Sequence, residues 1–210
     1  MLENILKISP IVPVVTIKKV EDAVPIAKAL LAGGIGVIEI TLRTDAALKA
    51  IADVSKNVSG MTVGAGTISN PEQFKQATDA GAKFIVSPGL TTKLAQFAQT
   101  QKTAFLPGVA TISEIMHARE NGFSYLKFFP ASLAGGAPAI KQFTSLFSDI
   151  QFCPTGGVNL ENMNEYFSIS KVVCIGGSWI TPDSLIGTKN WSEIERLSAE
   201  AISKVKRSSI

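Results

Sequence analysis

One lysine in this sequence stands where a lysine is costly, and its side chain could act as a nucleophile. Lys127 lies in the run Tyr125-Leu-Lys-Phe-Phe-Pro130, flanked by aromatic residues at the end of a short apolar segment. Burying an ammonium group is expensive, and a lysine amine kept away from water is the nucleophile that forms Schiff bases with ketones. The alternative is a structural lysine, whose amine reaches solvent at a rim or pairs with a carboxylate.

A second apolar segment carries a glutamate and an arginine that could work with this amine. Glu39 lies in Gly36-Val-Ile-Glu-Ile-Thr-Leu-Arg43, and a carboxylate near an amine and a water is a plausible general acid or base. Arg43 follows where the segment has become a loop, and its planar guanidinium suits a substrate carboxylate. Thr67, at the end of the next segment, could donate a hydrogen bond beside Arg43. The alternatives are an ion pair of Glu39 with Lys127 or Arg43, and an ordinary surface arginine.

Two pairs of adjacent glycines later in the chain could hold an anion. Thr155-Gly156-Gly157 and Gly176-Gly177-Ser178 each follow an apolar run. Glycine lets backbone N–H groups approach a phosphate closely, and in many barrel enzymes the loops after the last two strands bind one. The alternative is that both pairs form tight turns without a ligand.

The candidate residues recur at the ends of short β-branched runs that alternate with helix-like segments. The residues that mark these ends follow at intervals of 19 to 28 positions and are Glu39, Thr67, Pro88, Pro107, Lys127, Thr155 and Ser178. The expected strands are 11–15, 36–40, 62–65, 83–86, 104–106, 125–128, 151–153 and 172–175. Eight nearly equal strand–helix units predict one domain over residues 1–210 with the fold of a (β/α)8 TIM barrel. The alternative is an open doubly wound sheet, although no G-x-G-x-x-G follows the first strand.

Such a barrel would bring distant residues into one place. Its second and sixth strands face each other, so Glu39 and Lys127 would both point into the mouth where barrel enzymes carry their chemistry. Asn70-Pro71 and Thr111-x-x-Glu114 are helix-start signals, the second a capping box. The expected helices are 20–32, 45–56, 71–80 and 113–120, with an extra N-terminal helix at 1–8 and a C-terminal helix at 191–207.

Composition excludes several other kinds of protein. The chain has 210 residues, 46% of them hydrophobic, and its formal charge of +3 is scattered, so neither nucleic acid nor a membrane is an expected partner. It has no apolar stretch of spanning length and no signal peptide, which favours a cytoplasmic location. A single histidine, His117, cannot build a zinc site of two or three histidines, and we expect no metal and no cofactor. Cys153 and Cys174 are expected to be buried thiols.

Seven ordered motifs resemble one known family over nearly the whole chain. They are Glu39-x-Thr-Leu-Arg-Thr, Gly64-Ala-Gly-Thr, Val86-Ser-Pro-Gly, Leu106-Pro-Gly, Leu126-Lys-Phe-Phe-Pro-Ala, Cys153-Pro-Thr-Gly-Gly and Cys174-Ile-Gly-Gly-Ser-Trp. Together they resemble the bacterial 2-dehydro-3-deoxy-phosphogluconate aldolase/4-hydroxy-2-oxoglutarate aldolase family. The resemblance implies a class I, Schiff-base aldolase of the Entner–Doudoroff pathway and a homotrimer. Its substrate would be a phosphorylated keto-sugar acid, cleaved to pyruvate and glyceraldehyde 3-phosphate, with 4-hydroxy-2-oxoglutarate as a second substrate.

The resemblance also implies a role for each matching residue. Lys127 would form the imine and Glu39 would transfer protons. Arg43 and Thr67 would bind the carboxylate of the pyruvoyl end, and Pro88, Phe129 and Thr155 would line the substrate pocket. The residues that contact the phosphate would be Gly156, Gly157, Gly177 and Ser178. The chain departs from the family in Ala131-Ser-Leu-Ala-Gly135, where an acidic residue often follows Pro-Ala, and this loop could alter substrate preference.

Two other functions fit some of the same residues. A sugar-phosphate isomerase would use acid–base chemistry without a covalent lysine adduct. A catalytically silent trimer would bind keto acids without cleaving them. A covalent adduct on Lys127 would argue against the isomerase, and cleavage of the phosphorylated keto acid would argue against the silent trimer.

Overall fold

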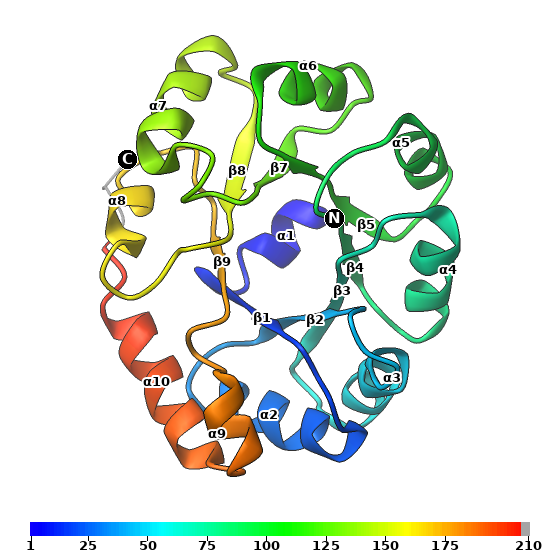
Figure 1. Cartoon of the computed structure of the whole chain (residues 1–210), viewed down its shortest axis with the longest axis vertical. Coiled ribbons are helices and arrows are strands. Elements are labelled where there is room, and N and C mark those ends of the chain that lie inside the picture. Colours follow the sequence, from blue (N-terminus) through cyan, green and yellow to red (C-terminus); the bar gives the residue numbers. More distant parts are fainter. Residues whose placement is uncertain (207–210) are drawn as a thin grey trace.

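The computed structural model describes residues 1–206, in which strands and helices alternate along the chain (Figure 1). The strands are β1 (Ile11–Val15), β2 (Val37–Thr41), β3 (Thr62–Gly66), β4 (Phe84–Val86), β5 (Ala104–Leu106), β6 (Gly108–Val109), β7 (Tyr125–Phe128), β8 (Gln151–Pro154) and β9 (Ile175–Gly177). The helices are α1 (Leu2–Leu6), α2 (Val20–Ala32), α3 (Ala47–Asn57), α4 (Pro71–Asp79), α5 (Thr92–Gln99), α6 (Ile112–Glu120), α7 (Gly136–Leu146), α8 (Met163–Phe167), α9 (Asp183–Gly187) and α10 (Trp191–Ser203).

The described strands form two sheets and no closed ring, so the predicted eight-stranded TIM barrel is wrong. The larger sheet has the order β5-β4-β3-β2-β1-β9 and the smaller β6-β7-β8. Pro107 separates β5 from β6, and proline has no N–H to donate to a ladder. Between β8 and β9 there are only the isolated bridges Phe152–Val172 and Thr155–Gly176. Unit spacing therefore predicts the number and order of units, but not whether every strand completes a ladder with its neighbour.

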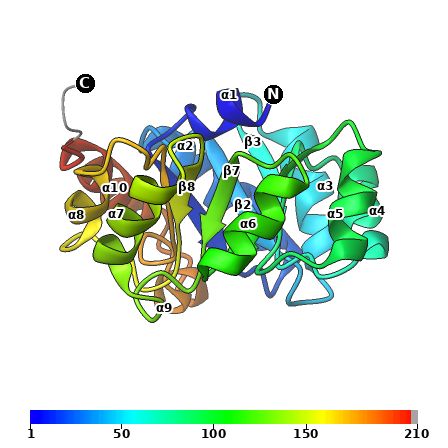
Figure 2. The ribbon, with the colours of Figure 1, turned by 90° about the horizontal axis from the view of Figure 1, so that it is seen from above.

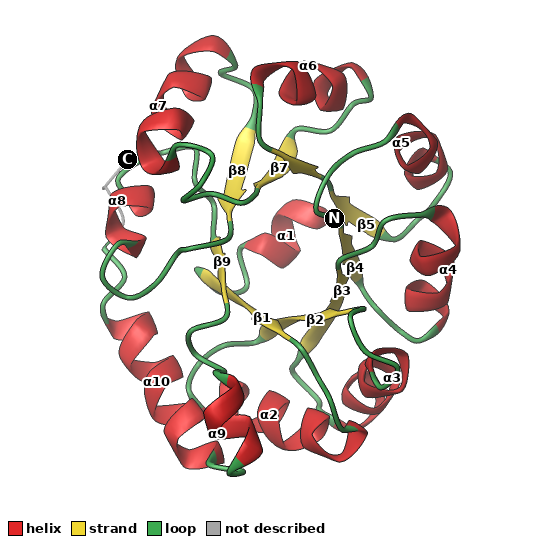
Figure 3. Ribbon diagram, in the orientation of Figure 1, coloured by secondary structure: helices red, strands yellow, loops and turns green. Residues whose placement is uncertain are grey.

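All the paired strands run parallel, so their carboxyl ends lie at one end of the molecule. The strands surround a common centre and the longer helices lie outside them (Figure 3). Helix α1 lies at the end opposite α9 (Figure 2). Leu2 of α1 and Tyr125, the first residue of β7, line one cavity, which places α1 at the amino ends of the strands. The loops that follow the strands lie at the opposite end, at the carboxyl ends of the strands, where they can form a site.

Most elements lie where the sequence predicts them. The strands at 11–15, 104–106 and 125–128 and the helix at 20–32 have the predicted bounds. Among the strands, the largest shift concerns the last one, predicted at 172–175, because β9 begins only at Ile175. A run of Val-Val-Cys-Ile does not show where pairing begins, since all its residues suit a strand equally well.

The predicted helix starts are confirmed. The Asn70 side chain accepts a hydrogen bond from Gln73 N at 2.9 Å, and the capping box of Thr111 and Glu114 is present. The extra helices at both ends also exist, as α1 and α10, but they are shorter than the predicted 1–8 and 191–207. Arg207 lies outside the described residues.

The interior between the strands and helices is apolar, with few exceptions. Asp22, Glu39 and Lys127 are the only charged side chains buried within the described part of the chain. No helix in residues 1–206 is long and apolar enough to cross a membrane. Two of these three buried charges, Glu39 and Lys127, are candidate site residues, which draws attention to the place where they meet.

Candidate active site

The structure brings Lys127 and Glu39 into contact, although they are 88 positions apart in the sequence and belong to different sheets. Lys127 Nζ lies 3.2 Å from Oε1 and 3.4 Å from Oε2 of Glu39. Their side chains are only 7% and 4% exposed. The ion pair that the sequence offered as the structural alternative is therefore present. The same geometry also supplies a buried amine with a proton acceptor beside it.

Strand alternation explains why both side chains face the interior. Successive residues of a strand point to opposite sides. Phe128, next to Lys127 on β7, turns outward, and its ring centroid lies 5.7 Å from that of Phe143 on α7. On β2, Glu39 and Thr41 share one face, and both are buried. Glu39 is the third residue of five in β2, so it lies deeper than the strand end at which the sequence placed it.

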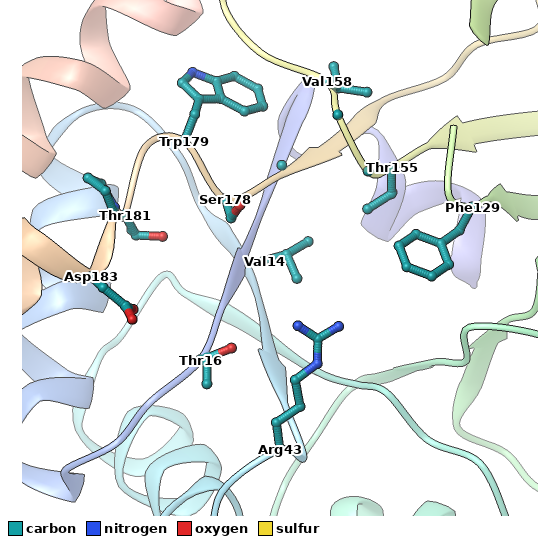
Figure 4. Close-up of a pocket in the computed structure, with 14 residues that line it drawn as sticks. Val14, Thr16, Arg43, Phe129, Thr155, Val158, Ser178, Trp179, Thr181 and Asp183 are labelled. Carbon is teal, nitrogen blue, oxygen red and sulfur yellow. The ribbon is translucent and has the colours of Figure 1, made fainter. Parts of the chain in front are cut away.

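An aromatic ring connects the buried amine with an open cavity. Lys127 Nζ lies 5.3 Å from the ring centroid of Phe129, within the range of a cation–π contact. Phe129 also lines a cavity of about 460 Å³ (Figure 4), a volume that suits a small-molecule site. The residues lining it are Val14, Thr16, Arg43, Phe129, Thr155, Gly156, Gly157, Val158, Gly177, Ser178, Trp179, Thr181, Pro182 and Asp183.

The cavity gathers most of the residues that the sequence singled out. The predicted residues in its lining are Arg43, Phe129, Thr155, Gly156, Gly157, Gly177 and Ser178. Lys127 and Glu39 are buried and do not line it, but the Lys127 amine lies against the ring of Phe129, which does. Thr67 and Pro88 do not line it. Thr67 follows β3 and is half-buried, and Pro88 follows β4 and is exposed. The role of each residue stays a prediction.

Arg43 and Thr67 each have an unusual local feature. The Arg43 guanidinium points into the cavity (Figure 4), and no carboxylate within residues 1–206 forms an ion pair with it. A substrate carboxylate could therefore take that place. Thr67 has a φ of 63°, which is unfavourable for a β-branched residue and is often found where a side chain is held for function.

The sequence reasoning missed the role of Gly66. Gly66 is paired with Thr41 in the ladder between β3 and β2, and a Cβ atom there would overlap Oε1 of Glu39. The carboxylate can reach Lys127 only because this position has no side chain. Two glycines spaced as in Gly64-Ala-Gly66 were a signal of close approach inside a strand. The sequence alone could not identify the approaching group.

Replacing Gly66 with alanine is expected to displace the Glu39 carboxylate from Lys127. Because this carboxylate is the candidate proton carrier, kcat should fall by about 100-fold or more, and overpacking should lower the free energy of unfolding by about 1–3 kcal/mol. Aldol cleavage rates and thermal melting measure both effects. Gly187→Ala is the matched control, because a Cβ at Gly187 meets no atom within 4 Å. Full activity of a folded Gly66→Ala protein would contradict the explanation.

The predictions about metal ligands and thiols concern residues outside the cavity lining. In the part of the chain that the structure describes, no three His, Cys, Asp or Glu side chains come together in a group that could hold a metal ion. Cys153 and Cys174 are both buried, as predicted. Cys153 is paired with Lys127 in the ladder of β7 and β8, so the two residues lie next to each other on neighbouring strands.

Fold and site together have the features of an α/β enzyme that reacts through a lysine amine. The amine and a carboxylate are in contact, a guanidinium faces the adjoining cavity, and glycine-rich loops close its wall. This set suits an enzyme that holds an anionic carbonyl compound while a lysine attacks it.

Comparison with known proteins identifies the family. The KDPG and KHG aldolase family, named for 2-dehydro-3-deoxy-6-phosphogluconate and 4-hydroxy-2-oxoglutarate, matches residues 2–197. The KHG/KDPG aldolase of Escherichia coli (strain K12) is 44% identical over 97% of this chain and 96% of its own. The chain belongs to this family, and it is a carbon–carbon lyase of the 2-dehydro-3-deoxy-phosphogluconate aldolase type.

Two solved structures share the fold. KDPG aldolase from Legionella pneumophila, with pyruvate captured as a covalent carbinolamine, has a TM-score of 0.94 and 42% identity, covering 96% of this chain and 98% of that one. The 2-keto-3-deoxy-6-phosphogluconate aldolase of Zymomonas mobilis ZM4, with 3-phosphoglycerate, has a TM-score of 0.94 and 42% identity, covering 100% of this chain and 98% of that one.

Proposed function

We propose that this protein cleaves KDPG to pyruvate and glyceraldehyde 3-phosphate through a Schiff base on Lys127. The observation that carries the proposal is the buried contact of Lys127 Nζ with Glu39 Oε1 at 3.2 Å, beside a cavity that Arg43 enters. The relative with pyruvate captured as a carbinolamine supports covalent attachment of the keto acid. Residues 1–210 form one domain in this proposal.

The first half of the reaction attaches the substrate. Glu39 accepts a proton from the Lys127 ammonium, and the free amine attacks the C2 carbonyl carbon to give a carbinolamine. The carboxylic acid of Glu39 then returns its proton to the departing hydroxyl. Water leaves and a protonated imine remains. One positive charge is present before and after these steps, and the carboxylate is restored.

The second half breaks the carbon–carbon bond. The Glu39 carboxylate removes the proton of the C4 hydroxyl, the C3–C4 bond breaks, and its electron pair moves toward the imine to form an enamine. The aldehyde leaves. Glu39 returns the proton to C3, and hydrolysis of the imine releases pyruvate and restores the Lys127 ammonium. The carboxylate thus moves every proton that the cleavage requires.

The cavity wall holds the two charged ends of the substrate in this proposal. Arg43 binds the carboxylate next to the ketone, and Thr67 donates a hydrogen bond beside it. Phe129 and Thr155 line the substrate pocket, and Pro88, which lies outside the cavity lining, completes it from the loop after β4. Backbone N–H groups around Gly156, Gly157, Gly177 and Ser178 bind the phosphate. Fixing both ends keeps the C3–C4 bond near its reactive geometry, which is a large part of the rate gain in such reactions.

Three further properties belong to the same proposal. The enzyme also cleaves 4-hydroxy-2-oxoglutarate to pyruvate and glyoxylate, and it works in the cytoplasm. It assembles as a homotrimer, which the exposed Ile112 and Met116 of α6 and Leu146 of α7 support, since exposed apolar side chains favour protein contacts. Sedimentation equilibrium measures the oligomeric state, and cleavage rates on the two substrates measure the second activity.

The experiment that tests the proposal combines turnover with covalent trapping. The purified protein is mixed with KDPG, and pyruvate release is followed through lactate dehydrogenase. In parallel, pyruvate and sodium borohydride are added, and the Lys127 peptide is examined by mass spectrometry for the reduced adduct. Pyruvate release together with an adduct on Lys127 supports the proposal. Absence of both, or turnover of a sugar phosphate without an adduct, would favour a silent binder or an isomerase.

A further inference from the structure

One buried hydroxyl of the cavity wall has no hydrogen-bond partner. Thr181 is only 5% exposed, and within the described residues no group is in hydrogen-bonding position to its Oγ1 atom. Buried polar side chains are nearly always paired, because a lost hydrogen bond to water is otherwise not replaced. Thr181 is also absent from the residues assigned a role above. An unpaired hydroxyl in a cavity wall points to a ligand.

The direction and neighbours of Thr181 support this reading. Its oxygen atom faces the cavity (Figure 4), and Thr181 N donates to Ser178 O at 3.1 Å, which folds the loop back against the glycine-rich segment. The other buried hydroxyl in the wall, Thr155, is within 3.4 Å of the Cys153 carbonyl oxygen. Thr16 in turn lies 2.9 Å from Thr41 Oγ1. Among these three threonines of the lining, Thr181 is the one whose hydroxyl has no protein partner, so a bound ligand would have to supply its hydrogen bond.

The position of Thr181 shows which part of a ligand it would meet. Phe129, which covers the Lys127 amine, lies on one side of the cavity, and Thr181 lies on the opposite side (Figure 4). A substrate bound through its ketone to Lys127 therefore extends toward Thr181 with its far end. Pyruvate has three carbon atoms and ends near the lysine. Only a substrate with an oxygen atom on its distal carbons can reach the Thr181 hydroxyl.

We propose that Thr181 is a specificity-determining residue, whose hydroxyl donates a hydrogen bond to an oxygen atom on the distal carbons of a long sugar-acid substrate. This inference rests on the proposed function, because it takes the ketone to be held by Lys127. A site built to hydrogen-bond a substrate oxygen discriminates strongly against ligands that lack it, since its buried group is then left unpaired. Thr181 therefore selects substrates by the length and oxygenation of the end remote from the lysine.

The test is Thr181→Val, which removes the hydroxyl and keeps the shape of the side chain. We expect KM for KDPG to rise about tenfold with little change in kcat, while the pyruvate concentration that half-saturates borohydride trapping changes less than twofold. We also expect Tm to rise by about 2–4 °C, because an unpaired buried hydroxyl is removed. A threonine whose hydroxyl is hydrogen-bonded within the protein would give the opposite sign, with lower Tm.

Comparing two substrates identifies the ligand atom that is hydrogen-bonded to Thr181. 2-Dehydro-3-deoxygluconate lacks the phosphate of KDPG but keeps the distal hydroxyls. A similar rise of KM for both compounds assigns the contact to a sugar hydroxyl, and a rise for KDPG alone assigns it to a phosphate oxygen. Both outcomes support the inference. An unchanged KM for both would overturn it.

Two controls separate failure of this inference from failure of the proposed function. Thr78 on α4 has the other buried side-chain oxygen atom without a partner in residues 1–206, and α4 lies outside the sheets (Figure 1). Thr78→Val should raise Tm in the same way and leave KM unchanged. An equal KM effect in Thr78→Val, or a lower Tm in Thr181→Val, would overturn the inference. Wild-type protein that neither cleaves KDPG nor forms an adduct would instead overturn the proposed function.

Discussion

Replacing Lys127 with methionine is expected to lower kcat for KDPG by about 10⁴-fold or more, because no other group can form the imine. Methionine fills a similar space, but it leaves the Glu39 carboxylate buried without its partner. Breaking a buried ion pair from one side typically costs about 3–5 kcal/mol of folding free energy, so the variant should be clearly less stable than the wild type. Borohydride reduction with pyruvate should leave the peptide unmodified at position 127.

A double variant separates the chemical effect from the loss of stability. Lys127→Met combined with Glu39→Gln removes both charges, so most of the lost stability should return while activity stays absent. Lys141→Met is the matched control, since Lys141 is exposed on α7 and should affect neither property. Thermal unfolding and pyruvate release provide the measurements. If Lys127→Met kept most of the wild-type turnover, the imine would have to form elsewhere.

The Lys127–Glu39 contact was predictable from the sequence because it depends on strand order and alternation. An aromatic run with a lysine and an apolar run with a glutamate mark two strand interiors, and parallel strands place both at one end of the fold. The prediction of a closed barrel failed at two local points. Pro107 lacks an N–H, and β9 begins at Ile175, three residues later than expected. Neither change moves Lys127 away from Glu39, since side-chain direction survives an interrupted ladder.

Other parts of the site could not be predicted because they depend on atoms that meet only in the fold. Gly66 matters through the Glu39 carboxylate on the neighbouring strand, and Gly177 through the Trp179 ring, which a Cβ there would overlap. Thr181 is one of many threonines in the sequence, and only its burial and missing partner distinguish it. A glycine in a sequence motif indicates that a side chain is not tolerated at that position. Only the folded structure shows which neighbouring group occupies the space that the side chain would fill.

A buried ion pair such as Lys127–Glu39 is a costly way to stabilise a fold, because both charges lose their hydration. Two apolar residues of similar size often stabilise an interior as well or better. Lys127 and Glu39 lie in an otherwise apolar interior, and Phe129 covers the amine on the cavity side. Their presence in this interior therefore fits a chemical role better than a stabilising one. In the proposed mechanism, the two charges hold each other in place until a carbonyl group binds. Glu39 is the only carboxylate within residues 1–206 that is hydrogen-bonded to Lys127.

Glu39→Gln is expected to separate imine formation from proton transfer. The amide oxygen can still accept a hydrogen bond from Lys127 Nζ, but it cannot carry a proton, so kcat for KDPG should fall by about 10²- to 10⁴-fold. Borohydride trapping of pyruvate on Lys127 should persist at a lower rate, because water can replace the carboxylate in the proton transfers of imine formation. Exchange of the pyruvate methyl protons with D₂O, followed by NMR, should be lost in parallel with kcat, because the same carboxylate moves the proton at C3. Glu120→Gln, at an exposed position of α6, is the control and should exchange at the wild-type rate. Unaltered methyl exchange in Glu39→Gln would assign the proton transfer to another group and leave Glu39 as the partner that holds the lysine in place.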